Sequence, residues 1–214
     1  MALTLLVGGA RSGKSSLAVE LGRRFDAGHD RPDPETEPPP ATLADLVGGV
    51  VYIATATSGD DDMSERIERH RAERPGHWWT VEETHDLGTA LGSVPSSCMA
   101  IIDCLTMWTT NRMLDDEPDS SIEIAARAIA AQAASRPGPT VVISNEVGLG
   151  IHPATEMGRH FRDLHGRVNQ LWAAAAQTTL LLVAGRAMPL THPVDLFGQV
   201  LGEDDATTTP PGVS

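Results

Sequence analysis

Short apolar runs alternate along the chain with longer segments in which apolar residues recur at helical spacing. Five runs have the length of a strand and are apolar on both faces: residues 3–7, 50–54, 99–102, 140–144 and 179–184. Runs of this kind, separated by helical patterns, predict a mostly parallel sheet with helices on both faces. The fold class is therefore α/β.

Two helical patterns carry a clear apolar stripe. In residues 15–25, Leu17, Leu21 and Phe25 recur at intervals of four, which predicts a helix directly after the first strand. After the fourth strand, arginines 159, 162 and 167 lie mostly off a longer stripe. That stripe consists of Met157, Phe161, Leu164, Val168, Leu171 and Ala175.

Two segments lack such a pattern. Residues 26–46 are acidic and contain five prolines, which predicts a flexible surface insertion. Residues 202–214 are rich in Asp, Thr and Pro, which predicts a disordered tail. A length of 214 residues is typical of one domain, so residues 1–201 are expected to form a single domain.

Composition excludes several classes of partner. A net charge of −13 argues against binding to nucleic acid or to anionic membranes. No stretch reaches 18 consecutive apolar residues, so no membrane span is expected. Two cysteines, Cys98 and Cys104, do not suggest a disulfide framework and favour a cytoplasmic location.

The sole lysine of the chain lies in its most informative motif. All fifteen other basic residues are arginine, whereas Lys14 completes a G-x-x-x-x-G-K-S string between the first strand and the first helix. The string consists of Gly8, Gly9, Ala10, Arg11, Ser12, Gly13, Lys14 and Ser15. Backbone N–H groups and the helix N-terminus there bind phosphate, and the Ser15 hydroxyl is placed to reach Mg²⁺. A chance glycine-rich turn is the weaker interpretation.

Asp103 follows the apolar run at 99–102. An acid at the end of a buried strand, downstream of a phosphate loop, predicts a Mg²⁺ ligand beside Ser15, acting directly or through water. The alternative is an acidic residue that starts a turn.

His70 is the candidate nucleophile. Acids at 60–62 suit the start of a helix, on which Met63, Ile67 and His70 share one face. A histidine in that position is usually a packed core residue. Arginines at 66, 69, 71 and 74 favour phosphate instead, and a neutral imidazole can attack it.

Polar residues also follow two later extended segments. Glu82 can bind a nucleotide base or ribose, or it is an ordinary surface acid, and the sequence leaves both open. Asn145 and Glu146 follow the fourth strand, where ligands bind in open α/β sheets.

Together these motifs resemble the bifunctional adenosylcobinamide kinase/adenosylcobinamide-phosphate guanylyltransferases of cobalamin biosynthesis. The likeness covers roughly residues 3–186. The matching strings are GGARSGKS at 8–15, YIAT at 52–55, Asp62-Met63 followed by Arg66-Ile67 and His70-Arg71, Arg74-Pro75 with His77-Trp78, NEVGLGI at 145–151, RHFRD at 159–163 and GRVNQ at 166–170.

The resemblance implies a RecA-like P-loop NTPase fold and two reactions. A nucleoside triphosphate, ATP or GTP, phosphorylates adenosylcobinamide, and GMP from GTP then passes through a histidine to the corrinoid phosphate. The resemblance assigns that histidine to His70. It also implies a homo-oligomer, since a characterised member is a trimer. It extends nucleotide contacts beyond the loop to Ala54, Thr55, Ala56, Arg71, Ala72, Glu73, Arg74, Glu82 and Asp103.

Two other classes of P-loop protein are alternatives to this resemblance. A different small-molecule kinase leaves His70 and its arginines unexplained. A GTPase switch needs an N-K-x-D string, which a chain with its one lysine at Lys14 cannot contain. Asp103 stands where some relatives carry Glu, which shortens the reach of the carboxylate.

Overall fold

The protein is described by a computed structural model that covers residues 3–28, 40–56 and 71–196. Outside these ranges lie His70, the predicted helix that leads to it, residues 29–39 of the predicted insertion and the predicted tail at 202–214. In the described residues, no helix has the length and apolar character that crossing a membrane requires.

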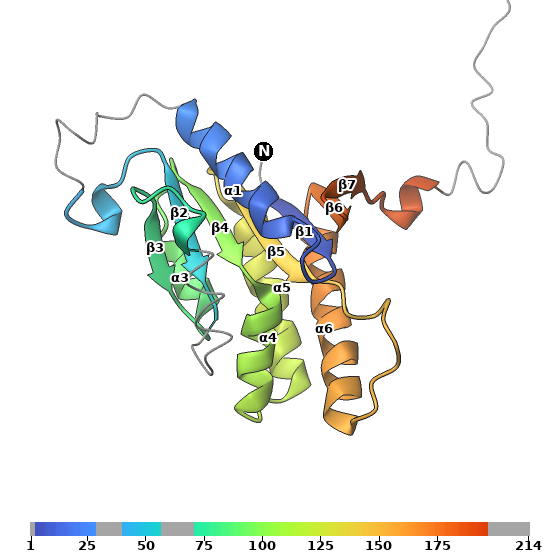
Figure 1. Cartoon of the computed structure of the whole chain (residues 1–214). Helices are drawn as coiled ribbons and strands as arrows, with labels where there is room; N and C mark the ends of the chain where they lie inside the picture. The colour runs from blue at the N-terminus through green and yellow to red at the C-terminus, as the bar shows by residue number, and fades with distance from the viewer. Residues whose placement is uncertain (1–2, 29–39, 57–70, 197–214) are drawn as a thin grey trace, which may run out of the picture.

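Seven strands form one sheet in the order β3-β2-β4-β5-β1-β6-β7 (Figure 1). Their bounds are Leu3–Gly8 (β1), Val50–Ala54 (β2), Trp79–Glu82 (β3), Met99–Asp103 (β4), Thr140–Asn145 (β5), Thr178–Val183 (β6) and Arg186–Pro189 (β7). Neighbouring strands are parallel except for β7, which is antiparallel to β6. All five predicted strands are confirmed, within a residue or two at their ends.

The sequence did not predict β7, and it overstated the burial of β6. Ala184 and Gly185 both have positive φ, at 51° and 73°, and they make the tight turn that joins the two strands. Since β6 has only this short hairpin partner beyond it, five of its six residues remain exposed or half-buried. The hairpin projects from one edge of the sheet (Figure 1).

Helices cover both faces of the sheet, as predicted. On one face, α1 (Lys14–Ala27) packs against residues such as Leu6, Tyr52 and Ile101. The opposite face carries the remaining long helices of the described residues. They are α3 (Leu87–Ser93), α4 (Leu105–Leu114), α5 (Asp119–Ser135) and α6 (Glu156–Ala175). Two short 3-10 helices, η1 (Leu43–Asp45) and η2 (Pro193–Leu196), complete the fold.

The buried face of α1 is not the predicted one. Leu17, Leu21 and Phe25 are half-buried at its flank, whereas Ala18 and Gly22 face the sheet with Val19. Small residues let the helix approach the sheet closely. Because Gly22 has no side chain, the Trp78 ring can pack directly against it. Close helix–sheet packing therefore overrides the simple apolar stripe.

The predicted stripe on α6 is confirmed at Leu164 and Val168 and wrong at Met157, which is 62 % exposed. The first turns of the helix extend beyond the strands, so they have no sheet to pack against (Figure 1). Further along, His165, Asn169 and Trp172 are buried as well. Two polar side chains in this interior were not expected from the sequence.

The predicted insertion at 26–46 is shorter than expected. Asp26 belongs to α1, and its carboxylate lies 2.5 Å from His77 Nε2 and accepts a hydrogen bond of 3.1 Å from Trp78 Nε1. At the other end η1 is ordered by a capping box, and Leu46 is buried in the core. Contacts with residues distant in the sequence hold both ends of the segment in place. The composition of the segment alone does not predict such contacts.

We expect Gly22→Ala to destabilise the protein by about 1–3 kcal/mol, because the added methyl group overpacks the helix–sheet contact. A Cβ at this position would lie 2.4 Å from Trp78 Cη2, which forces a shift. Urea unfolding measures the change. Gly166→Ala on α6 is the matched control, because nothing lies within 4 Å of its Cβ and alanine favours a helix. Equal stability of Gly22→Ala and the unaltered protein would contradict the close packing.

Candidate active site

The phosphate loop links β1 to α1, and its glycines are required by geometry at both ends. A Cβ on Gly8 would lie 2.3 Å from the Leu182 carbonyl oxygen, so only glycine allows this approach to β6. Gly13, at the start of α1, has φ of 100°. No acidic residue occupies the first turn of α1. The helix therefore begins with N–H groups that suit an anion.

The Lys14 side chain is folded back over the loop. It is only 6 % exposed, and its Nζ donates to the carbonyl oxygens of Gly8 at 2.8 Å and Gly9 at 2.7 Å. Burial lowers the pKa of Lys14, and the nearby Cys104 and Asp103 oppose that shift. A compact ammonium group fits this cradle of carbonyls, whereas a planar guanidinium is far larger.

Asp103 ends β4 next to the loop, as predicted. The Ser15 hydroxyl lies 3.4 Å from Asp103 Oδ2, and the Tyr52 hydroxyl donates to the same oxygen. Burial and the neighbouring Asp103 carboxylate raise the pKa of Tyr52 well above its ordinary value, so the phenol stays a donor. A serine hydroxyl and a carboxylate are oxygen ligands of the kind that Mg²⁺ takes.

The donor set at Asp103 fits a Mg²⁺ ion that shares its coordination with a nucleotide. No group of three or more His, Cys, Asp and Glu side chains gathers within the described ranges, so no all-protein metal cage exists there. Mg²⁺ characteristically uses one or two protein ligands and fills its shell with phosphate oxygens and water. Ser15 and Asp103 would hold such an ion.

The segment at 71–74 brings positive charge to the same place. The Arg74 guanidinium lies 3.7 Å from the centroid of the Tyr52 ring, and Arg71 pairs with Glu82. Arg23 of α1 donates to the Glu73 carbonyl at 3.0 Å, which joins this segment to the phosphate-loop helix.

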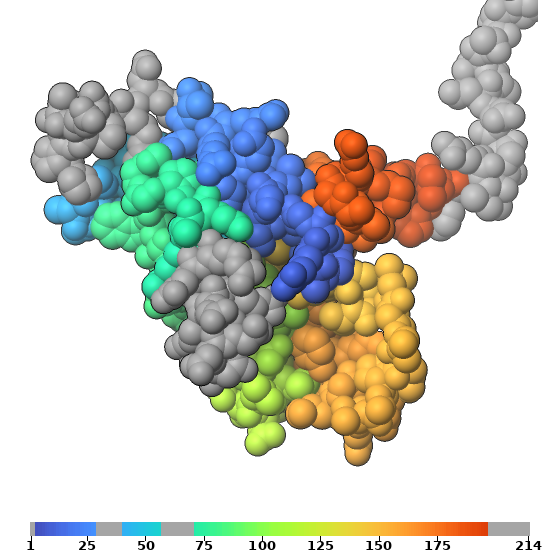
Figure 2. Space-filling view, in the orientation of Figure 1, coloured from blue at the N-terminus to red at the C-terminus, as the bar shows by residue number. Residues whose placement is uncertain are grey.

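A cleft of about 540 Å³ unites these groups. Its predicted lining residues are Ala10, Arg11, Ser12, Gly13, Lys14, Ser15, Ala54, Ala56, Arg71, Glu73, Arg74, Glu82 and Asp103. In Figure 2 the tip of the phosphate loop, in dark blue, lies at the surface of the molecule. The structure thus brings together residues that lie up to 93 positions apart, from Ala10 to Asp103.

Four predicted contact residues do not line the cleft. Gly8 and Gly9 serve the site through their carbonyls, which hold Lys14. Thr55 is fully buried, and its hydroxyl donates to the Cys104 carbonyl and accepts from the Cys104 N–H, each at 2.7 Å. Ala72 is exposed beside its lining neighbours. These residues shape the site without facing the cavity.

The sequence did not identify several lining residues. They are Ser16, Tyr52, Cys104, Met107 and Ile143, with Asn145, which it placed only in the region where ligands bind. Tyr52 had a usable signal, since it is the chain's one tyrosine and stands in a buried strand. Cys104 is a poor nucleophile, because burial raises its pKa to about 11.

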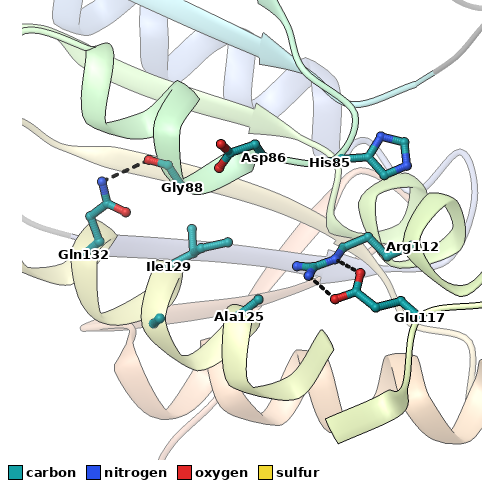
Figure 3. Close-up of a pocket in the computed structure, with 9 residues that line it drawn as sticks. His85, Asp86, Gly88, Arg112, Glu117, Ala125, Ile129 and Gln132 are labelled. Atoms are coloured by element: carbon teal, nitrogen blue, oxygen red, sulfur yellow. Dashed lines mark hydrogen bonds and ion pairs between the residues drawn. The ribbon is translucent and has the colours of Figure 1, made fainter. Parts of the chain in front are cut away.

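Another cavity, of about 490 Å³, lies between α3, α4 and α5 (Figure 3). Its polar side chains have partners within the protein: Arg112 pairs with Glu117 through two nitrogens, and Gln132 donates to the Gly88 carbonyl at 3.1 Å. No predicted site residue lines it. We interpret it as a surface hollow whose polar groups already have hydrogen-bond partners within the protein.

Sequence similarity to known proteins identifies the family of this chain. The model of the family described as "Cobinamide kinase / cobinamide phosphate guanyltransferase" matches residues 41–190. The chain belongs to this family. It is 37 % identical over 188 residues to the bifunctional adenosylcobalamin biosynthesis protein CobP of Pseudomonas aeruginosa, covering 87 % of this chain and 95 % of that protein. It is 35 % identical over 196 residues to the protein CobU of Escherichia coli, named as the same bifunctional type, covering 86 % and 96 %.

Six of the eight histidines lie in the described residues, and none of these six lines the cleft. Carboxylates hold two of them: His77 lies 2.5 Å from Asp26, and His160 lies 2.7 Å from Asp119. Burial lowers the pKa of His165 to about 4.

Proposed function

We infer that this chain carries out both reactions of its family. It phosphorylates adenosylcobinamide with a nucleoside triphosphate, and it then transfers GMP from GTP to adenosylcobinamide phosphate, giving adenosylcobinamide-GDP. The observation that carries the inference is that the phosphate loop and the arginine-bearing segment at 71–74 open onto one cleft. One nucleotide site that carries cations both on the phosphate loop and on the segment at 71–74 suits attack at two different phosphates. These are the terminal phosphate in the kinase reaction and the α-phosphate in guanylyl transfer.

The kinase step asks little covalent chemistry of the protein. The hydroxyl oxygen of the corrinoid attacks the terminal phosphorus, and the bond to the bridging oxygen breaks. Lys14 and the loop N–H groups are placed to hold the charge that develops on the phosphate oxygens. Mg²⁺ held by Ser15 and Asp103 would supply further charge neutralisation to the phosphates.

We place the guanylyl intermediate on His70. An imidazole nitrogen attacks the α-phosphorus of GTP, the bond to the β-phosphate oxygen breaks, and pyrophosphate leaves. The phosphoramidate then passes GMP to the phosphate of the corrinoid, and the imidazole is regenerated. What supports this residue is its neighbour Arg71, which lines the cleft, together with the absence of the six described histidines from the cleft lining.

Incubation with adenosylcobinamide tests the proposed function. With ATP alone, mass spectrometry should show the corrinoid gaining one phosphate; adding GTP should convert this product to adenosylcobinamide-GDP. A P-loop kinase of another specificity would leave the corrinoid unchanged and would phosphorylate other small alcohols. Product formation only from adenosylcobinamide phosphate would assign guanylyl transfer alone to this chain.

Asp103→Asn tests the metal site. We expect the Mg²⁺ concentration for half-maximal kinase activity to rise about tenfold or more, because the amide is neutral and coordinates a hard cation weakly. Titration of the kinase rate with Mg²⁺ measures this. Asp115→Asn is the matched control, because Asp115 is an exposed partner of His85 outside the cleft. An unchanged titration for Asp103→Asn would exclude this carboxylate as a Mg²⁺ ligand.

A homo-oligomer, specifically a trimer, is part of the proposal. Exposed apolar side chains gather on and after the β6–β7 hairpin: Val183, Met188, Leu190 and Val194. An apolar patch at a sheet edge is typical of a surface that another copy covers. A single domain over residues 1–201 and a cytoplasmic location, which free Cys98 and Cys104 suit, belong to the same proposal.

We expect sedimentation equilibrium of the purified protein to give about three times the chain mass of 22.7 kDa. Met188→Asp should shift the mass toward that of one chain, because a carboxylate in an apolar interface is strongly unfavourable. Ile124→Asp on α5 is the control, since Ile124 is also exposed but lies away from the hairpin. A single-chain mass for the unaltered protein would refute the trimer.

A further inference from the structure

Asn145 occupies a position between the two halves of the phosphate site. It ends β5, which lies between β1 and β4. In the strand register Asn145 pairs with Gly8, the first residue of the phosphate loop, while Ile143 pairs with Asp103. Asn145 also lines the nucleotide cleft. Its side chain is therefore near both the loop and the carboxylate that would hold Mg²⁺.

The backbone of Asn145 is held from two sides. Its N–H donates to Thr106 Oγ1 of α4 at 2.8 Å. Its carbonyl oxygen accepts from Asn169 Nδ2 at 3.0 Å and lies 3.2 Å from His165 Nε2, both on α6. Two helices thus fix one residue at the carboxyl edge of the sheet.

The groups that hold the Asn145 backbone form a buried polar network. Ser144 Oγ donates to Asn169 Oδ1 at 2.5 Å and lies 3.0 Å from His165 Nε2, while Thr109 Oγ1 lies 3.2 Å from His165 Nδ1. Burial lowers the pKa of His165 to about 4, so the imidazole is neutral and Nε2–H can donate to the Asn145 carbonyl. Polar groups are costly in a core unless they are satisfied, and here the network converges on one residue.

The side chain of Asn145, by contrast, makes no hydrogen bond to any group within the described ranges. Its amide offers two N–H donors to the cleft. A rigid backbone with an uncommitted donor beside a phosphate loop is the arrangement that preorganised charge stabilisation requires.

We propose that Asn145 is a further catalytic residue of the phosphoryl transfer, whose side-chain amide donates to an oxygen of the terminal phosphate. Thr106, His165 and Asn169 are positioning residues that act through its backbone. This proposal rests on the kinase reaction proposed above. The amide transfers no proton: it stabilises the charge on the terminal phosphate as the corrinoid hydroxyl attacks. The bond to the bridging oxygen breaks, the nucleoside diphosphate leaves, and the hydroxyl proton is released to solvent.

Asn145→Ala tests the direct contact. Removing one preorganised donor lowers kcat of the kinase reaction by about 10²–10³-fold. The melting temperature should stay within about 2 °C, because the side chain holds nothing else in the described residues. Protein labelling by α-labelled GTP should fall by less than about tenfold, because that attack is at the α-phosphate. Gln132→Ala is the control, since it removes a side-chain amide that donates to the Gly88 carbonyl outside the nucleotide cleft.

Thr106→Val and Thr106→Ser test the positioning residues. Valine keeps the shape but removes the acceptor of the Asn145 N–H, so kcat should fall by about tenfold while KM for ATP is unchanged. Serine keeps the hydroxyl and should restore most of the rate. If Thr106 had a merely structural role, both variants would have a lower melting temperature, and kcat would not respond differently to valine and to serine.

Three results would overturn the proposal. Wild-type kinase rates for Asn145→Ala would remove the catalytic role while the proposed function stands. Equal loss of α-GTP labelling and of phosphorylation would show that the amide serves the nucleotide as a whole and not the terminal phosphate. An unaltered protein that does not phosphorylate adenosylcobinamide would refute both this inference and the proposed function.

Discussion

Lys14→Ala should abolish both reactions, with a loss of nucleotide affinity and turnover of about a hundredfold or more. Lys14 is the one lysine in a chain of net charge −13, and its Nζ is cradled by the carbonyls at the start of the loop. A bound triphosphate would offer that ammonium group better partners than these carbonyls, because charged acceptors bind it more strongly than neutral ones. Removing it leaves the phosphates without their nearest compact cation.

The affinity for ATP and GTP, measured by calorimetry, and the rates of both reactions check this result. Arg24→Ala is the matched control: it removes one positive charge from the same helix, but Arg24 is exposed and pairs with Glu20 outside the cleft. Lys14→Arg should fail as well, because a residue 6 % exposed has no room for a guanidinium. Retention of activity in Lys14→Ala would show that the loop is not the catalytic nucleotide site.

His70→Ala should eliminate covalent labelling of the protein by α-labelled GTP, and with it guanylyl transfer. The label on the unaltered protein should be labile to acid and stable to base, as expected of a P–N bond. Kinase activity should fall much less, because phosphorylating an alcohol needs positioning and a metal ion and no covalent histidine. The variant therefore separates the two reactions within one chain.

His77→Ala and His160→Ala are the controls for this experiment. Both histidines are held by carboxylates, from Asp26 and Asp119, and neither lines the cleft. Each variant should label as strongly as the unaltered protein. Labelling that persists in His70→Ala and disappears in one of the other two would place the nucleophile there, although the family assignment would stand.

The electrostatic design of the site explains how an acidic protein can bind a polyanion. Over the whole chain acidic residues outnumber basic ones by 29 to 16. Within the cleft, however, Lys14, Arg11, Arg71 and Arg74 face the same space as the start of α1. Local donors fixed in a partly enclosed cavity decide phosphate binding, whereas net charge acts only at long range.

Sequence alone determined the architecture of this protein, because its signals are local. A parallel strand buried on both faces must be apolar throughout, so residues 50–54, 99–102 and 140–144 were recognisable without any partner. The phosphate loop was equally clear, since its glycines, lysine and serine act within eight consecutive residues. Asp103 followed from its position at the end of a buried strand.

Only the tertiary structure decided which side chains share the cleft and which are buried. Tyr52 stands 51 positions from Asp103, yet its hydroxyl donates to that carboxylate because β2 and β4 are neighbours in the sheet. Position 22 is a glycine that faces the sheet because the Trp78 ring occupies the space that a Cβ would need. The buried His165 likewise finds partners in Thr106 and Thr109 of α4, which lie 59 and 56 positions away in the sequence. Periodicity reports which face of an element is apolar, but contacts between elements distant in sequence decide where a polar side chain can be satisfied.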